Sequence, residues 1–167
     1  MRQEGWSLGL GGDEIAIPAK VQDLIDALDL QGDRAASYLD LDTGEVHVIA
    51  HEAFAIAEEG AGAHPLDCEE EEVALAQRIL SSDRYVELPT SLDVHEWRIM
   101  EAFSSSLADE DLRADCLRAI RGRRAFRAFR NELSRHGLWD AWHAFRDAAL
   151  RKIAIAWCEE HGIAFQA

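Results

Sequence analysis

The segment 121–130 is the part of the chain whose side chains have the clearest chemical use. It reads Arg-Gly-Arg-Arg-Ala-Phe-Arg-Ala-Phe-Arg, with five arginines in ten residues. Interpreted as a helix that opens after Gly122, it has a buried stripe formed by Phe126, Phe129 and Leu133. The adjoining arc of the same helix holds Arg123, Arg127 and Arg130. Guanidinium groups clustered in this way are typical of a surface that binds carboxylates or phosphates.

Charge is divided unevenly along the chain, whose formal net charge is -15. Residues 1–112 carry 6 basic and 26 acidic side chains, whereas residues 113–167 carry 11 basic and 6 acidic ones. This asymmetry indicates either a basic surface for an anionic partner or two halves that attract each other inside the fold. In the second case the arginines of the helix would pair with Asp23, Asp26 or Asp40. The sequence leaves both interpretations open.

We predict a non-enzymatic binding or regulatory protein that uses this helix to engage an acidic protein partner. The predicted partner-binding residues are Arg121, Arg123, Arg124, Arg127, Arg130, Trp139 and His143. Arginines in the first turns of a helix oppose its dipole, so folding alone does not favour them. The alternative partner is RNA or single-stranded DNA, because arginine contacts phosphates and aromatic rings stack on unpaired bases. The net charge repels a polyanion, and Phe126 and Phe129 are assigned to the core, so we favour the protein partner.

The other reactive side chains do not combine into a recognisable motif. The seven histidines are scattered singly, and Ser104-Ser105-Ser106 lacks the context of a nucleophile elbow. His51-Glu52 begins like a zinc-protease helix, but position 55 is alanine. Cys158 and His161 lie at a helix C-terminus, where a thiol pKa is not lowered. We therefore predict no catalytic site, no cofactor and no metal. The melting temperature should accordingly be unchanged in EDTA. The second alternative function is an enzyme whose site is not visible in the sequence.

Length and composition are those of an ordinary folded protein. The chain has 167 residues, of which 48% are hydrophobic, enough for one core or two small subdomains. Its three cysteines form no CxxC pair, which indicates reduced thiols. No apolar run approaches the roughly 20 residues of a membrane span, so we expect a soluble protein whose partner is not a membrane. The N-terminus lacks a secretory pattern, so we expect a cytoplasmic location. The sequence does not indicate an oligomeric state.

Residues 13–89 are predicted to form a small α+β subdomain, after a glycine-rich flexible leader at residues 1–12. Apolar residues at helical spacing predict a helix at about 18–30, and Ile15-Ala16-Ile17 before it alternates like a strand. Strands at 37–41 and 45–49 are predicted to flank an Asp42-Thr43-Gly44 turn, with Leu39 and Leu41 on the apolar face toward that helix. A helix at about 68–82, capped by Asp67, and a strand at 84–88 follow.

Residues 90–167 are predicted to form a helical subdomain. Four amphipathic helices are expected at about 92–107, 109–122, 123–137 and 138–161. The first would be capped by Thr90 and Asp93, with a buried stripe of Trp97, Met100, Phe103 and Leu107. The predicted fold class is therefore α+β: a small antiparallel sheet with one or two helices, followed by a C-terminal bundle of about four helices.

Several motifs together resemble those of a bacterial family known only as uncharacterised protein family 0158. They are Tyr38-Leu39-Asp40-Leu41-Asp42-Thr43-Gly44-Glu45, Arg84-Tyr85 to Pro89, Met100-Glu101-x-Phe103, Gly122 to Phe129, and Trp142-x-x-Phe145. The resemblance extends over nearly the whole chain from about residue 14. The family pattern Gly-Lys-Gly-Ala-Phe-Arg-Arg-Phe-Lys-Asp is similar to residues 122–131, but here Arg124 replaces a glycine, Ala128 an arginine and Asn131 an aspartate. The resemblance implies a shared fold and a special status for this segment, and it implies no activity.

Overall fold

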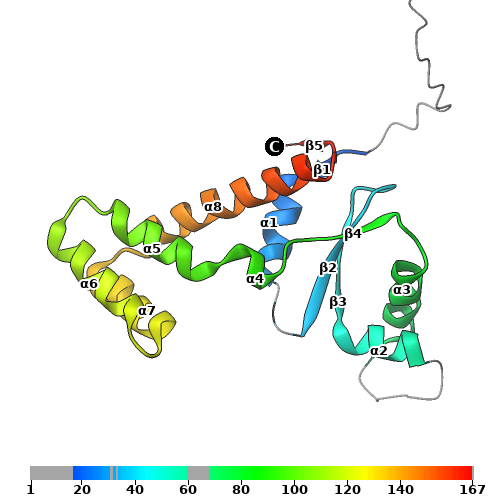
Figure 1. Cartoon of the computed structure of the whole chain (residues 1–167), viewed down its shortest axis with the longest axis horizontal. Helices are drawn as coiled ribbons and strands as arrows, with labels where there is room; N and C mark the ends of the chain where they lie inside the picture. The colour runs from blue at the N-terminus through cyan, green and yellow to red at the C-terminus, as the bar shows by residue number, and fades with distance from the viewer. Residues whose placement is uncertain (1–16, 31, 33, 60–67, 167) are drawn as a thin grey trace, which may run out of the picture.

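The computed structural model describes residues 17–30, 32, 34–59 and 68–166 (Figure 1). The elements in chain order are β1 (Ala19–Lys20), α1 (Val21–Leu30), β2 (Ala35–Asp40), β3 (Val46–Ala50), α2 (His51–Glu59), α3 (Glu70–Leu80), β4 (Tyr85–Glu87), α4 (Ser91–Val94), α5 (Glu96–Ser106), α6 (Glu110–Arg121), α7 (Ala125–His136), α8 (Trp139–Glu160) and β5 (Phe165–Gln166). The predicted α+β class with a C-terminal helical bundle is confirmed. The predicted leader at residues 1–12 lies outside the described residues.

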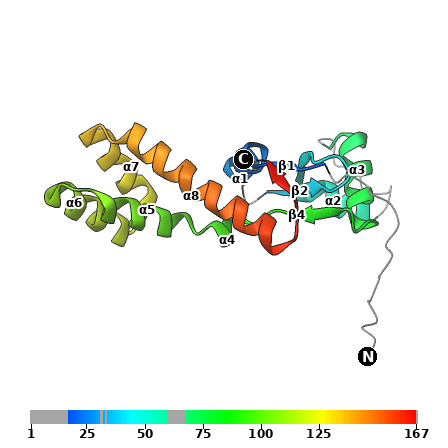
Figure 2. The same cartoon turned by 90° about the horizontal axis from the view of Figure 1, so that it is seen from above.

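The described part of the molecule is elongated, as Figures 1 and 2 show from two directions. Helices α6 and α7 lie at one end, and α2 and α3 lie at the other. Helix α8 runs from the end that holds α6 and α7 to the middle of the molecule, where α1 packs against it. The arginine-rich segment is thus far from the sheet. None of the described helices is both long and apolar enough to cross a membrane.

The main sheet is antiparallel, with β2 in the centre between β3 and β4. In this register Leu39 of β2 lies opposite Val46 of β3 and Val86 of β4. Leu39 is fully buried, and the two valines pack against the same core, which also contains the inner face of α1. The predicted apolar face of the hairpin toward the first helix is confirmed by these contacts.

The opposite face of the sheet is covered as well, by α2 and α3. Ile49 of β3 packs there with Ala53 of α2 and with Ala76 and Ile79 of α3. A charged residue of the sheet is buried too: Asp40 of β2 is only 2% exposed. The sequence pattern did not predict this burial.

The start of α1 differs from the prediction. The helix was expected from about residue 18 but begins at Val21, because Ala19 and Lys20 pair in parallel with Phe165 and Gln166. Neither of these short strands was predicted. The strand expected at residues 15–17 lies mostly outside the described residues, and Ile17 is exposed and not in a strand.

The predicted helix at 92–107 is two helices. His95 adopts a left-handed conformation with φ of 49°, which an α-helix cannot continue through, so α4 ends there and α5 begins after it. The predicted cap is present in α4, since the Asp93 carboxylate accepts a hydrogen bond from the Thr90 backbone N–H at 2.8 Å. Trp97, expected in the buried stripe, is exposed, although its indole N–H donates to the Ile120 carbonyl at 2.9 Å.

An aromatic cluster holds the bundle of α5 to α8 together. Phe103 of α5 contacts Phe129 of α7 and both Trp142 and Phe145 of α8 in edge-to-face arrangements. The same core continues through α8 to α1 and to Leu39 of β2. The division of the chain into an α+β subdomain at residues 13–89 and a helical subdomain at residues 90–167 stays a prediction.

Candidate functional site

Five arginines surround the turn that joins α6 to α7, a surface called here the arginine corner. Helix α6 ends at Arg121, and Gly122, Arg123 and Arg124 connect it to the start of α7 at Ala125. The side chains of all five arginines are exposed: Arg121, Arg123, Arg124, Arg127 and Arg130. Figure 1 places α6 and α7 at the end of the molecule away from α2 and α3, so the corner is a separate positive surface.

No ion pair joins an arginine of the corner to any other described residue. The arginines that do form ion pairs lie elsewhere: Arg84, Arg113, Arg118, Arg135 and Arg146. Two of the aspartates considered for internal pairing have other partners, since Asp40 pairs with Arg84 and Asp26 accepts a hydrogen bond from Gln22 at 2.9 Å. The positive charge of the corner is therefore not neutralised by the described part of the chain.

Phe126 lies in the middle of the corner and is 53% exposed, although the sequence pattern assigned it to the buried stripe. Helix α7 begins at Ala125, and its covered arc is centred on Phe129 and on the side that faces α6. With about 100° per residue, Phe126 is rotated by about 60° from Phe129 toward the other edge of that arc. The stripe is therefore buried at Phe129 and Leu133, and Phe126 is an exposed aromatic ring among cations.

Trp139 and His143 lie at the opposite end of α7 from the corner. They stack on each other on the first turns of α8, with ring centroids 5.5 Å apart. The Trp139 indole N–H donates to Ser134 at 3.0 Å, one helical turn beyond Arg130. Because the 12 residues of α7 span about 18 Å, the predicted residues do not form a compact pocket: the arginines lie at one end of this helix and the stacked rings at the other.

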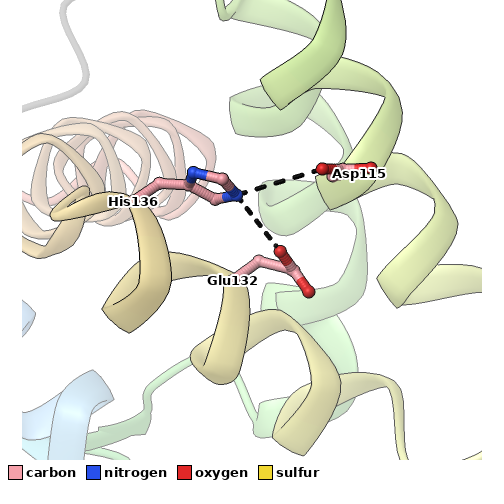
Figure 3. A group of neighbouring side chains, drawn as sticks. All are labelled: Asp115, Glu132 and His136. Atoms are coloured by element: carbon pink, nitrogen blue, oxygen red, sulfur yellow. Dashed lines mark ion pairs between the residues drawn. The ribbon is translucent and has the colours of Figure 1, made fainter.

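A second cluster lies between the same two helices and was not predicted. Asp115 of α6 and Glu132 and His136 of α7 place one ligand atom each within 4.8 Å of the others (Figure 3). The His136 Nε2 atom lies 3.3 Å from a Glu132 oxygen and 3.9 Å from an Asp115 oxygen. Glu132 and His136 are four residues apart, so the sequence already indicates that they lie on the same face of a helix. Asp115 gives no such signal, because only the packing of α6 on α7 brings it there.

The buried nucleophiles of the described chain are not activated. Burial raises the pKa of the Cys116 thiol, and the nearby carboxylates of Glu132 and Asp115 raise it further. Burial likewise raises the pKa of Cys158, with an added effect of Glu159. Both thiols are therefore protonated at neutral pH and are poor nucleophiles. These properties agree with the prediction of a non-enzymatic protein, which stays a prediction.

Comparison with known proteins gives a family and no activity. No curated protein and no solved structure matches this chain. Residues 16–167 match the family described as uncharacterised protein family (UPF0158), which agrees with the resemblance in the hairpin, in β4 and in the arginine-rich segment. Because the match covers nearly the whole chain, this protein belongs to the uncharacterised protein family UPF0158.

Proposed function

We propose that this chain is a non-enzymatic binding protein and that the arginine corner is its contact surface for an acidic segment of another protein. One observation carries the proposal: five exposed arginines without an ion pair to any described residue surround an exposed phenylalanine. Arginine binds carboxylates through two parallel hydrogen bonds, and aromatic rings supply apolar contact area. Arginine and aromatic residues are also enriched where protein interfaces gain most of their binding energy.

The conformation of the corner adds support, because it is unfavourable for folding. Arg124 has a φ of 63° in the left-handed region, which costs an L-residue with a Cβ atom about 1–2 kcal/mol. The first turn of α7 carries Arg127 and has no acidic residue, so positive charge lies at the positive end of the helix dipole. These two local costs to folding support a use of the arginines outside the fold.

Single-stranded nucleic acid is a second candidate partner, favoured by the exposure of Phe126. An exposed ring beside arginines is suited to stacking on an unpaired base while the guanidinium groups contact phosphates. The objection that Phe126 belongs to the core does not apply, since the ring is half exposed. The net charge of -15 still opposes a polyanion, so we favour the acidic protein segment.

Replacing Arg123, Arg127 and Arg130 with glutamine tests the proposal. The free energy of unfolding should change by less than about 0.5 kcal/mol, because exposed side chains without ion pairs contribute little to it. Binding of a labelled peptide rich in glutamate with one apolar residue, measured by fluorescence anisotropy, should be lost. A clear loss of stability with unchanged binding would instead indicate that the arginines serve the fold.

A matched control removes three charges elsewhere. Arg34, Arg78 and Arg98 are exposed and lie outside the corner, so their replacement with glutamine changes the net charge equally. This variant should keep the binding. A single-stranded oligonucleotide is measured in parallel at low and moderate salt. Binding of the oligonucleotide alone, weakening steeply with salt, would assign the corner to nucleic acid.

Replacing Arg124 with glycine should raise the free energy of unfolding by about 0.5–1 kcal/mol. Relief of the left-handed conformation gains about 1–2 kcal/mol, and the greater backbone freedom of glycine in the unfolded chain removes part of this gain. Chemical denaturation followed by circular dichroism measures the change. Arg123→Gly is the control, because Arg123 does not have a positive φ and glycine there should not stabilise the protein. Equal effects of both substitutions would contradict the assigned strain.

A further inference from the structure

The cluster of Asp115, Glu132 and His136 has the arrangement of side chains that bind a metal ion between two helices. Glu132 and His136 lie one turn apart in α7 and therefore project from the same face. Asp115 projects toward them from the neighbouring α6, as Figure 3 shows. All three side chains are partly buried rather than free on the surface. The two helices thus hold three possible ligand atoms in one place.

The distances are close to those that coordination requires. In a tetrahedral site with metal–ligand distances of about 2.0–2.2 Å, neighbouring ligand atoms are about 3.3–3.6 Å apart. The His136 Nε2 atom lies 3.3 Å from the nearer oxygen of Glu132 and 3.9 Å from that of Asp115. The remaining pair of ligand atoms, from Asp115 and Glu132, also lies within 4.8 Å.

The His136 Nε2 atom lies within ion-pair distance of both carboxylates. It is buried from solvent and has no hydrogen-bond partner among the described residues, although it points between two carboxylates (Figure 3). Buried polar atoms in folded proteins almost always have a partner. Two arrangements would satisfy the atom: a proton on Nε2 shared with a carboxylate, or a cation held between this nitrogen and the carboxylate oxygens.

Two arginines compete for the carboxylates but do not close the site. Arg118 pairs with one oxygen of Asp115 at 3.0 Å, while the other Asp115 oxygen faces His136. Arg135 pairs with Glu132 at 3.2 Å. The arginine side chains are 74% and 65% exposed, and ion pairs of this kind are weak. A cation could therefore displace Arg135 from Glu132 and leave Arg118 in contact with Asp115.

We propose that Asp115, Glu132 and His136 bind one divalent cation of the zinc class, a first-row transition metal, between α6 and α7. One imidazole nitrogen and two carboxylate oxygens suit Zn²⁺ and its neighbours, whereas Mg²⁺ and Ca²⁺ prefer oxygen ligands alone. A bound cation would link α6 to α7, the two helices that carry the arginine corner. The absence of a metal motif along the sequence led to the opposite expectation, because the third ligand comes from another helix.

Titration of the untagged, chelator-treated protein with ZnCl2 tests this inference. Calorimetry should give one equivalent bound per chain, and the melting temperature should rise with zinc. Co²⁺ in place of zinc should give the visible absorption of a coordinated ion. His136→Gln should weaken zinc binding by at least about a hundredfold, since loss of even an indirect supporting group costs about 10–100-fold. Asp115→Asn should weaken it in the same way.

Two further variants make the result specific. His51→Gln removes an exposed histidine from α2, outside the cluster, and should leave zinc binding unchanged. Asp115→His replaces one ligand with another and should keep it. The zinc-dependent rise in melting temperature is compared within each variant, so a change in stability without zinc does not affect the conclusion. Absence of saturable binding by the native chain, or binding that persists in both His136→Gln and Asp115→Asn, would overturn the proposal.

Discussion

Replacing Phe129 with alanine should lower the free energy of unfolding by about 3–5 kcal/mol, the range for truncation of a buried phenylalanine. Only 1% of Phe129 is exposed. Its ring packs edge to face on Trp142 and Phe103, with ring centroids 4.9 Å and 6.1 Å away. Phe129 therefore connects α7 to α8 and to α5. Truncation leaves a cavity at the point where three helices meet. Urea unfolding followed by circular dichroism measures the loss.

Phe126 provides the matched control, because it is the same residue type in the same helix. It is 53% exposed, so Phe126→Ala should change the free energy of unfolding by no more than about 0.5 kcal/mol. The same variant should weaken binding of the acidic peptide at the arginine corner. Similar losses of stability for both variants would mean that α7 packs through a different face.

Replacing Asp40 with alanine should lower the free energy of unfolding by about 1–3 kcal/mol, since it removes the buried partner of the half-exposed Arg84 and leaves a backbone donor without its partner. The Asp40 side chain is 3% exposed and pairs with Arg84 from the adjacent strand end. It also accepts a hydrogen bond from the Asp42 backbone N–H at 2.9 Å, within the hairpin turn. The variant therefore loses a contact between β2 and the segment before β4 as well as a contact inside the turn.

Asp42→Asn is the control for Asp40. Asp42 also contacts Arg84, at 3.1 Å, but its side chain is 58% exposed, so its replacement should cost less than about 1 kcal/mol. Asp40→Asn should fall between the two, because the amide oxygen can still accept from the Asp42 N–H. If Asp42→Asn lowered the free energy of unfolding as much as Asp40→Ala, the exposure of the aspartate would not determine how much its ion pair with Arg84 contributes.

Asp40 also predicts how stability depends on pH. Burial alone would raise the pKa of the Asp40 carboxyl, but the hydrogen bond and charge of Arg84, with the Asp42 backbone N–H, lower it below its ordinary value. The unfolded chain therefore binds this proton at higher pH than the folded chain. The contribution of Asp40 is fully present above about pH 4, the unfolded pKa of aspartate, and is lost as pH falls toward the folded pKa. The free energies of unfolding of the native protein and of Asp40→Ala are measured in urea between pH 6 and 3. The difference between the two free energies should shrink as the pH falls. A difference that is independent of pH would contradict this linkage.

The elements with local signals could be predicted. The spacing of Val21, Leu24 and Leu28 predicted α1, and these three residues are buried. Turn residues were also informative, because Gly44 and Gly137 both adopt the left-handed conformation, at the hairpin turn and at the end of α7. The interaction that decides each of these features lies within a few residues of sequence, so a single chain is sufficient to see it.

The elements set by distant contacts could not be predicted. Strand β1 exists because Ala19 and Lys20 meet Phe165 and Gln166 from the other end of the chain. The break at His95 interrupts an apolar spacing that continues through it, so the pattern predicted one helix where the fold has two. In the first case pairing with a remote segment overrides a local preference.

The same division holds for the candidate site. The sequence by itself determined that five arginines and two phenylalanines lie within ten residues, and that Phe129 and Leu133 face the core. Only the tertiary structure decided that those arginines lack ion pairs to the described residues, that Phe126 is exposed, and that Asp40 is buried against Arg84, 44 residues away. It alone placed Asp115 beside Glu132 and His136. Hydrophobic periodicity depends on neighbours within one helix, whereas ion pairing, exposure and ligand geometry depend on which surfaces the packed helices bring together.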